Sequence, residues 1–198
     1  MAFEERAKIV RLFGNEKDYV ETVLDYMFDK RYQPDNPEKT VSKEFFEYLL
    51  SKKYVNKNGY GKGRLIFYST FFNGIDLDVI APHKRTTKTV KVPILFETVP
   101  ENSKGTFTLI YVPFDIIHDK ERLKKEVPED LKLLKKVIPK MMLEYGFSAK
   151  KTSGYGVVDE DIDGFIKVGS IEVRFNSWKD FMKSIDKNCK VVIHEQGS

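Results

Sequence analysis

The spacing of the apolar residues changes about a quarter of the way along the chain, and this change limits the fold more than any other feature. Before residue 56 apolar residues recur every three or four positions, as they do on one face of a helix. From 64 to 113 they form short runs rich in β-branched and aromatic residues, which are typical of strands. The segment 128–145 returns to helical spacing. The sequence therefore predicts an α+β fold whose N-terminal part, 1–55, is helical.

Capping residues, glycines and prolines set the expected limits of the elements. Pro128 suits the first position of a helix, and Pro139 should kink that helix or mark its restart. The expected helices are 3–13, 16–32, one that begins at Ser42, 128–145 and 178–185. The expected strands are 64–68, 75–80, 94–99, 106–113 and one or two within 165–175. These elements predict one domain over 1–198, with a sheet core at 63–175 and a C-terminal helix and tail at 176–198.

Composition excludes several classes of protein. Apolar residues make up 41% of the 198 residues and charged residues 32%, which describes a soluble globular chain and not a disordered one. Cys189 is the only cysteine, so no disulfide forms within the chain and no zinc-binding spacing exists, and a reducing cytoplasm is the expected location. No stretch has the length of a membrane span. We therefore expect no membrane partner, no metal and no cofactor.

A glycine loop follows the helix predicted at 128–145. The sequence YGFSAKKTSGYGV at 145–157 contains Gly146, Gly154 and Gly156 around a basic pair. Glycine allows positive φ angles and lets a backbone come close to a bulky anion such as phosphate. The same residues also suit a helix that ends at Gly146 and a turn that leads into a strand. Both interpretations remain open from the residues alone.

A second glycine cluster, NKNGYGKG at 56–63, suggests a phosphate-binding loop because a lysine stands among the glycines. A Walker A loop needs a glycine where Asn56 stands and a serine or threonine where Gly63 stands. The dinucleotide-binding fingerprint needs a strand before the glycines, whereas the preceding segment has helical spacing. The sequence therefore predicts a turn here and not one of these nucleotide-binding loops.

A basic segment, PHKRTTKTVKV at 82–92, contains four cationic side chains and no acidic one. It is either an exposed hairpin tip kept soluble by its charge or a surface that binds nucleic acid. His83 lies beside these cations and could act as a general acid or base, whereas His118 and His194 are expected to be surface residues. Aligned proton-transfer partners for His83 are not evident in the sequence.

Three stretches in this order resemble the RAMP superfamily of CRISPR ribonucleoprotein complexes, and in particular its Cmr-type branch. They are GRLIFY at 63–68 with IDLDVIAPH at 75–83, TVP at 98–100 with GTFTL at 105–109, and the glycine loop. The resemblance covers about 6–158. It implies a ferredoxin-like (RRM-like) core with a mainly antiparallel sheet and a basic β-hairpin excursion. It further implies a non-catalytic structural subunit of a type III CRISPR effector complex, which contacts guide or target RNA.

The resemblance also implies which residues face the RNA. Cations and backbone N–H groups would contact phosphate and sugar, and Tyr155 would stack on an unpaired base or pack in the core. The partners would be single-stranded RNA and other effector subunits. The predicted RNA-binding residues are Lys84, Arg85, Lys88, Lys91, Gly146, Lys150, Lys151, Gly154, Tyr155 and Gly156.

Two other functions remain as alternatives. Metal-independent endoribonucleases of the superfamily process repeat RNA with a histidine, and His83 is the candidate here. A protein–protein scaffold without RNA contact is the second alternative. The family also places a strand before the helix that 3–13 resembles, so either 165–175 fills that place in the sheet or a separate chain supplies the strand.

Overall fold

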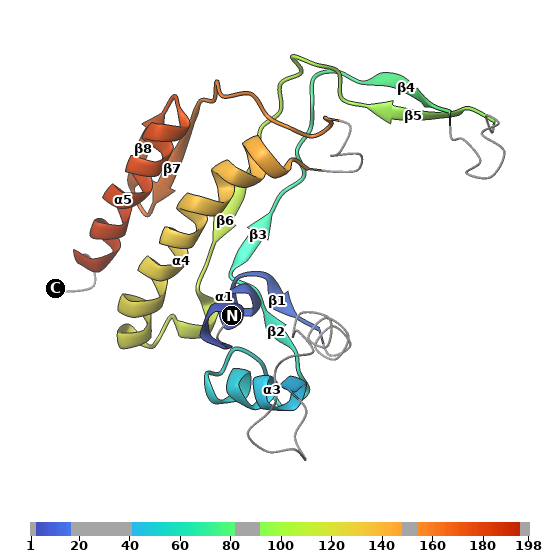
Figure 1. The fold of residues 1–198 in the computed structure, drawn as a ribbon. Coiled ribbons are helices and arrows are strands. Elements are labelled where there is room, and N and C mark those ends of the chain that lie inside the picture. Colours follow the sequence, from blue (N-terminus) through green and yellow to red (C-terminus); the bar gives the residue numbers. More distant parts are fainter. Residues whose placement is uncertain (1–2, 17–40, 82–91, 148–153, 195–198) are drawn as a thin grey trace. The chain divides into compact units, whose positions relative to one another are not determined.

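The structure is a computed structural model that describes residues 3–16, 41–81, 92–147 and 154–194. These residues include four α-helices, whose bounds are α1 (Phe3–Phe13), α3 (Val41–Ser51), α4 (Lys120–Lys140) and α5 (Trp178–His194) (Figure 1). The strands form antiparallel pairs: β1 (Gly14–Asn15) with β2 (Gly61–Lys62), β3 (Leu65–Phe67) with β6 (Leu109–Tyr111), β4 (Asp76–Ile80) with β5 (Ile94–Thr98), and β7 (Gly164–Val168) with β8 (Ile171–Phe175). The predicted α+β class and the antiparallel pairing are confirmed, but the described strands form separate two-stranded sheets instead of one sheet core.

The chain divides into two compact units. One unit joins Met1–Arg64 with Pro113–Ser198, and the other is Leu65–Val112. The expected helix at 16–32 falls almost wholly in the segment 17–40, which lies outside the described residues.

The predicted start of the long helix is wrong. α4 begins at Lys120 instead of Pro128, because the Asp119 side chain accepts a hydrogen bond from the Arg122 backbone N–H at 3.0 Å and caps the helix there. α4 continues through Pro139, which is expected to kink the helix or mark its restart, and ends one residue later at Lys140. The missing N–H of Pro139 removes one helical hydrogen bond, and a π-helix, η2 (Met141–Tyr145), follows directly. The C-terminal helix, α5, also continues beyond the predicted limit at 185.

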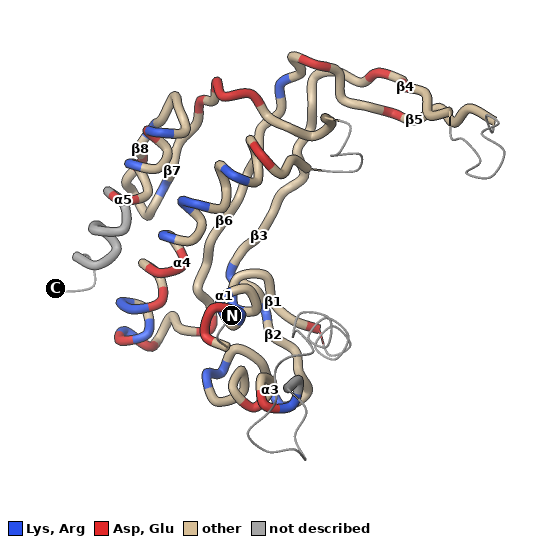
Figure 2. The backbone as a smooth tube through the Cα atoms, viewed as in Figure 1, with Lys and Arg blue, Asp and Glu red and all other residues tan. Residues whose placement is uncertain are grey.

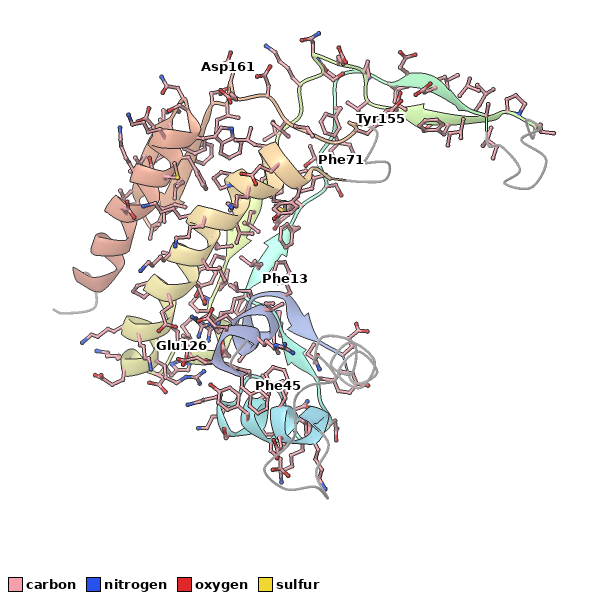
Figure 3. All side chains as sticks on the ribbon, viewed as in Figure 1. Phe13, Phe45, Phe71, Glu126, Tyr155 and Asp161 are labelled. Atoms are coloured by element: carbon pink, nitrogen blue, oxygen red, sulfur yellow. The ribbon has the colours of Figure 1, made fainter. Side chains whose placement is uncertain are left out.

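A core cluster joins α1 and α3. Ala7 of α1 lies with Phe45, Leu49 and Val55, and all four side chains are buried. Phe45 is labelled on α3 in Figure 3. The rings of Phe3 and Phe45 lie 5.3 Å apart in a tilted arrangement. Helical spacing places the α3 members one turn apart on the same face, so the two helices bury their apolar faces against each other.

The glycines beside this core allow backbones to pack closely. A Cβ atom on Gly63 would lie 2.4 Å from the Phe13 carbonyl carbon, and one on Gly61 would lie 2.3 Å from the Tyr54 carbonyl oxygen. Gly14 has a φ of +85°, which side chains disfavour. Gly63 therefore lets the chain after β2 pack against the end of α1, and Gly61 lets β2 pack against the chain at Tyr54.

α5 packs on α4 and on the β7–β8 hairpin in the same unit (Figure 1). The rings of Phe175 and Phe181 meet edge to face at 5.3 Å. Among the described residues, β7 and β8 pair with each other and join no other sheet. The expectation that 165–175 completes a larger sheet is therefore not met.

The unit Leu65–Val112 contains β3–β6 and β4–β5. In β4 the side chains of Leu77 and Val79 are exposed, at 62% and 51%, whereas Ile80 is half-buried. Asp76 and Asp78 accept hydrogen bonds from the next backbone N–H groups at 2.7 Å. The sequence predicts that one side of this strand faces water. In the structure the more exposed side is the one that carries Leu77 and Val79.

Within the described part of the chain, the structure contains no helix that is both long and apolar enough to cross a bilayer.

Candidate functional site

The base of the glycine loop is closed by backbone contacts. The Gly146 N–H donates to the Met141 carbonyl at 2.9 Å, and Gly146 leaves the helix with a φ of +67°. The Phe147 N–H donates to the Gly156 carbonyl at 2.8 Å. Gly156 has a φ of +80°, and a Cβ atom there would lie 1.8 Å from the Phe147 carbonyl oxygen. Glycine at 156 is therefore needed for the two ends of the loop to meet.

Four of the predicted RNA-binding residues lie in the described part of the chain. The structure brings Gly146 and Gly156 together, whereas Gly154 has open space around its Cα. Tyr155 is half-buried. The other predicted RNA-binding residues lie outside the described residues, namely Lys84, Arg85, Lys88, Lys91, Lys150 and Lys151. His83, the candidate general acid or base, also lies outside them.

A network of buried ion pairs joins α1, α4 and the chain at Arg64. Asp130 is 0% exposed and accepts hydrogen bonds from Arg11 Nε at 2.7 Å and from Arg64 Nη1 at 2.9 Å. Arg64 is 1% exposed and also donates to Asp115 Oδ2 at 2.7 Å and to Glu126 Oε2 at 2.6 Å. We call this set the ion-pair network, and its members are Arg11, Arg64, Arg122, Asp115, Glu126, Glu129 and Asp130.

Burial and charge act against each other in this network. Burial favours the neutral form of Arg11, but the carboxylate of Asp130 and hydrogen bonds outweigh it and raise the pKa of Arg11. Burial also favours the neutral form of Glu126, which for a carboxyl group means a higher pKa. Hydrogen bonds from Arg122 and Arg64 outweigh burial and lower that pKa below its usual range. Both groups therefore stay charged inside the protein.

The lowered pKa of Glu126 predicts a loss of stability in acid. Its contribution is fully present above the ordinary glutamate pKa of 4.5 and is lost as the pH falls through the lower folded value. We expect the drop in Tm between pH 7 and pH 3 to be smaller in Glu126→Gln than in the wild type, as measured by circular dichroism. Glu121→Gln, an exposed change in the same helix, should keep the wild-type drop. An unchanged drop in Glu126→Gln would contradict the assignment.

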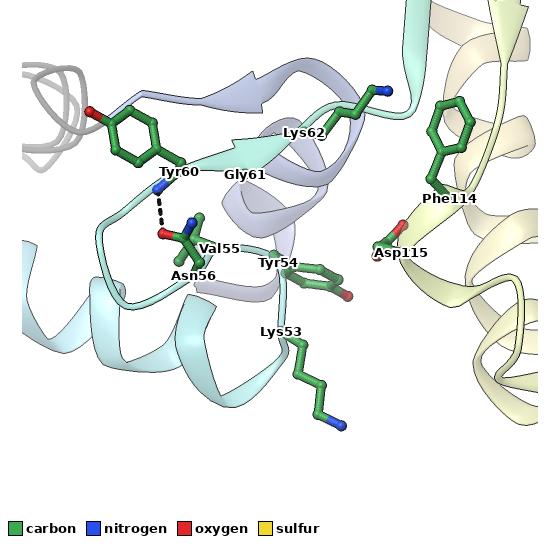
Figure 4. A pocket seen from close by; sticks show the side chains of 9 residues that line it. All are labelled: Lys53, Tyr54, Val55, Asn56, Tyr60, Gly61, Lys62, Phe114 and Asp115. Atoms are coloured by element: carbon green, nitrogen blue, oxygen red, sulfur yellow. Dashed lines mark hydrogen bonds between the residues drawn. The ribbon is translucent and has the colours of Figure 1, made fainter.

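The ion-pair network also positions one wall of a pocket. Asp115 is held by two hydrogen bonds from Arg64, at 2.8 and 2.7 Å, and its neighbour Phe114 lies at the rim. The opposite wall is the chain at 53–56 and 60–62, which follows α3. The pocket has a volume of about 310 Å³ and opens to solvent (Figure 4).

Cations and aromatic rings line this pocket. The Lys62 ammonium lies 4.3 Å from the centroid of the Phe114 ring, a cation–π contact. Tyr54 also lines the pocket, and the guanidinium carbon of Arg122 in α4 lies 5.4 Å from the centroid of its ring. Burial raises the pKa of the Tyr54 phenol, so it remains a neutral hydrogen-bonding group at neutral pH. The pocket thus combines positive charge with ring surface.

Sequence reasoning missed both the ion-pair network and the pocket. The cluster at 56–63 was the one available signal for the pocket, and comparison with known phosphate loops excluded it. For the network, a signal exists in α4: Glu126 and Asp130 lie four residues apart on the apolar face that holds Val127 and Leu134. Acidic residues on a buried face require cationic partners.

Comparison of the chain with protein-family models, with curated proteins and with solved structures finds no match.

Proposed function

We propose that the chain is a non-catalytic RNA-binding structural subunit of a type III CRISPR effector ribonucleoprotein in the cytoplasm. Its core would be the ferredoxin-like fold of the RAMP superfamily, with the basic segment at 82–92 as the hairpin excursion. The motifs at 63–68, 75–83 and 98–109 and the glycine loop support this proposal by their order along the chain.

The observation that carries the proposal is the closed base of the glycine loop. The hydrogen bond from Phe147 to Gly156 holds the two ends of 147–156 together at 2.8 Å. Val158 anchors the outgoing chain, because its N–H donates to the Met142 carbonyl at 3.0 Å. Loop ends that are held together reduce the entropy cost of an interaction between the loop and a partner. Such a loop therefore suits cations that must meet a phosphate backbone.

This arrangement favours recognition of RNA by charge instead of by sequence. Lysine and arginine side chains neutralise phosphates and displace condensed counterions, which makes binding depend strongly on salt. Tyr155 is half-buried at the end of the loop, and under this proposal its ring would stack on an unpaired base. Sequence specificity would come from base pairing by the guide.

The test is the replacement of Lys84, Arg85 and Lys88 by alanine, followed by titration with single-stranded RNA over a series of salt concentrations. Each lost phosphate contact should reduce the slope of log K against log salt by about 0.7, and by about 2 for the triple variant. The loss of affinity should be similar for all RNA sequences because phosphate is common to them.

The matched control uses three lysines of α4, whose basic residues are spread along the helix in Figure 2. Lys124, Lys132 and Lys136 are all exposed. Lys135 is left intact because its ammonium pairs with Asp186 of α5. The control triple removes the same charge and should change the slope little. Equal losses in both triples would mean that the attraction is diffuse net charge, and the proposed surface would be rejected.

A further inference from the structure

We propose that the pocket between the end of α3 and Phe114 binds one unstacked nucleotide of the RNA strand. The base would occupy the pocket, and the phosphates on either side of it would lie at Lys53 and Lys62. This inference rests on the proposed function, which supplies the strand. It adds a site that is separate in sequence from the basic segment and from the glycine loop.

The size of the pocket suits a single nucleotide. Pockets that hold small ligands span roughly 300 to 1,000 Å³, and this one, at about 310 Å³, stands at the lower limit. It is built within one unit of the chain, from the stretch after α3 and from the residues before α4. The ion-pair network holds the Asp115 wall in place.

The charges around the pocket suit a ligand with two anionic groups. Lys53 and Lys62 extend from opposite sides of the pocket (Figure 4), and both are exposed. Asp115 is the acidic residue of the lining, but Arg64 donates two hydrogen bonds to its carboxylate and compensates its charge. Two ammonium groups on either side of a cavity match the two phosphates that flank each nucleotide of a strand.

Ring surface is available for the base between these cations. Phe114 is 44% exposed at the rim, and Lys62 fixes one side of its ring through the cation–π contact. Tyr54 presents a second ring to the pocket, held by a hydrogen bond from Arg11 Nη1 to its hydroxyl at 3.2 Å. Bases of any identity stack on aromatic rings, because each base has a π face.

The backbone of Lys53 is the second, independent observation. Lys53 has a φ of +59°, and its N–H donates to the Leu50 carbonyl at 3.0 Å just after α3 ends. Helices commonly end with a residue in this left-handed conformation, and it is usually glycine because a Cβ atom is disfavoured there. A lysine at such a position costs stability, and strained residues of this kind cluster at functional sites. Lys53 therefore places a cation at the pocket in a backbone conformation that glycine would adopt at lower cost.

The test compares pocket variants with a matched control in the same turn. Lys53→Gly should keep or raise the Tm, since glycine relieves the strained φ, and should weaken binding of a uridine trinucleotide about fivefold. Lys62→Gln should weaken it by a similar factor. Phe114→Ala should weaken it by at least about fivefold through lost stacking. Lys57→Gln removes an exposed cation that does not line the pocket and should leave the affinity unchanged.

A comparison of ligands distinguishes the contribution of the base to the affinity from that of the phosphates. Binding is followed by calorimetry and by the NMR shifts of the Gly61 and Lys62 amides in the full chain. A trinucleotide without its central base should bind at least about fivefold more weakly than the complete one. Uridine monophosphate, with one phosphate, should also bind more weakly. If it binds as tightly as the trinucleotide, the ligand is a free nucleotide and the strand assignment is overturned.

Failure of this inference differs from failure of the proposed function. If long single-stranded RNA binds the wild type and all three pocket variants equally, the pocket is not a nucleotide site and the proposed function stands. If the wild type binds no single-stranded RNA of any length, the proposed function fails and the strand-bound site fails with it.

Discussion

Replacement of Asp130 by asparagine is expected to lower the free energy of unfolding by about 3–5 kcal/mol. The change keeps the shape of the side chain but removes the negative charge that faces Arg11 and Arg64. Both guanidinium groups are buried, at 5% and 1% exposure, so neither can regain water. Asp130 is the fully buried acceptor that both guanidinium groups share, so its neutralisation weakens two buried charge-assisted hydrogen bonds at once, although the other carboxylates of the network stay in place. Urea denaturation followed by circular dichroism measures the loss.

Glu129→Gln is the matched control for this prediction. Glu129 is the neighbouring acidic residue and accepts from Arg11 Nη2 at 3.2 Å, but its side chain is 33% exposed. Solvent screens such a pair, and its loss should cost less than about 1 kcal/mol. If Asp130→Asn were as mild as Glu129→Gln, the ion-pair network would not be the buried, charged framework described here.

Gly156→Ala is expected to open the base of the glycine loop. A Cβ atom at 156 would lie 1.8 Å from the Phe147 carbonyl oxygen, so the backbone must move. The positive φ adds a cost of about 1–2 kcal/mol for a residue with a side chain. Hydrogen exchange at the Phe147 amide should become faster as its bond to Gly156 is lost. Under the proposed function, RNA affinity should fall about 10- to 30-fold if the contacts of Lys150 and Lys151, of about 1 kcal/mol each, are lost.

Gly154→Ala is the control that separates the cost of a positive φ angle from the cost of a steric clash with the backbone. Gly154 has a φ of +89°, similar to that of Gly156, but no atom lies within 4 Å of a Cβ placed there. Its replacement should therefore carry the φ cost alone and leave the Phe147 amide protected. Equal exchange rates at Phe147 in the two variants would show that close backbone contact does not hold the loop base. Unchanged RNA affinity in Gly156→Ala, despite an open base, would instead count against the role of the loop in binding.

The ion-pair network and the pocket share Asp115. The Asp115 carboxylate accepts hydrogen bonds from Arg64 and also forms part of the pocket wall. Substitutions in the network should therefore disturb the pocket as well as the fold. For this reason the pocket is better tested through Lys53, Lys62 and Phe114, whose side chains lie outside the ion-pair network.

Local physics explains what could be predicted from the sequence. Helical spacing at 3–13 predicts α1 correctly, and β-branched runs at 75–80 and 94–99 predict β4 and β5 nearly to their ends. Gly146 ends its helix as its lack of a Cβ predicts. These features depend on residues that are close together in the chain. The proposed RNA-binding role likewise comes from motifs in the sequence, and the closed loop base adds support for it.

The sequence alone determined the α+β class, the assignment of segments to helix or strand, and the position of the glycine loop in the chain. It could do so because residue spacing and turn chemistry act over a few residues. Only the tertiary structure decided which charged side chains are buried and which residues line the pocket. Arg11 and Asp130 stand far apart in the chain, and their pairing depends on how α1 and α4 pack. Phe114 joins Lys62 at the pocket for the same reason. Long-range packing sets the dielectric around each charge. The acidic residues on the apolar face of α4 indicate that buried cationic partners are needed, but they do not indicate which cations these are.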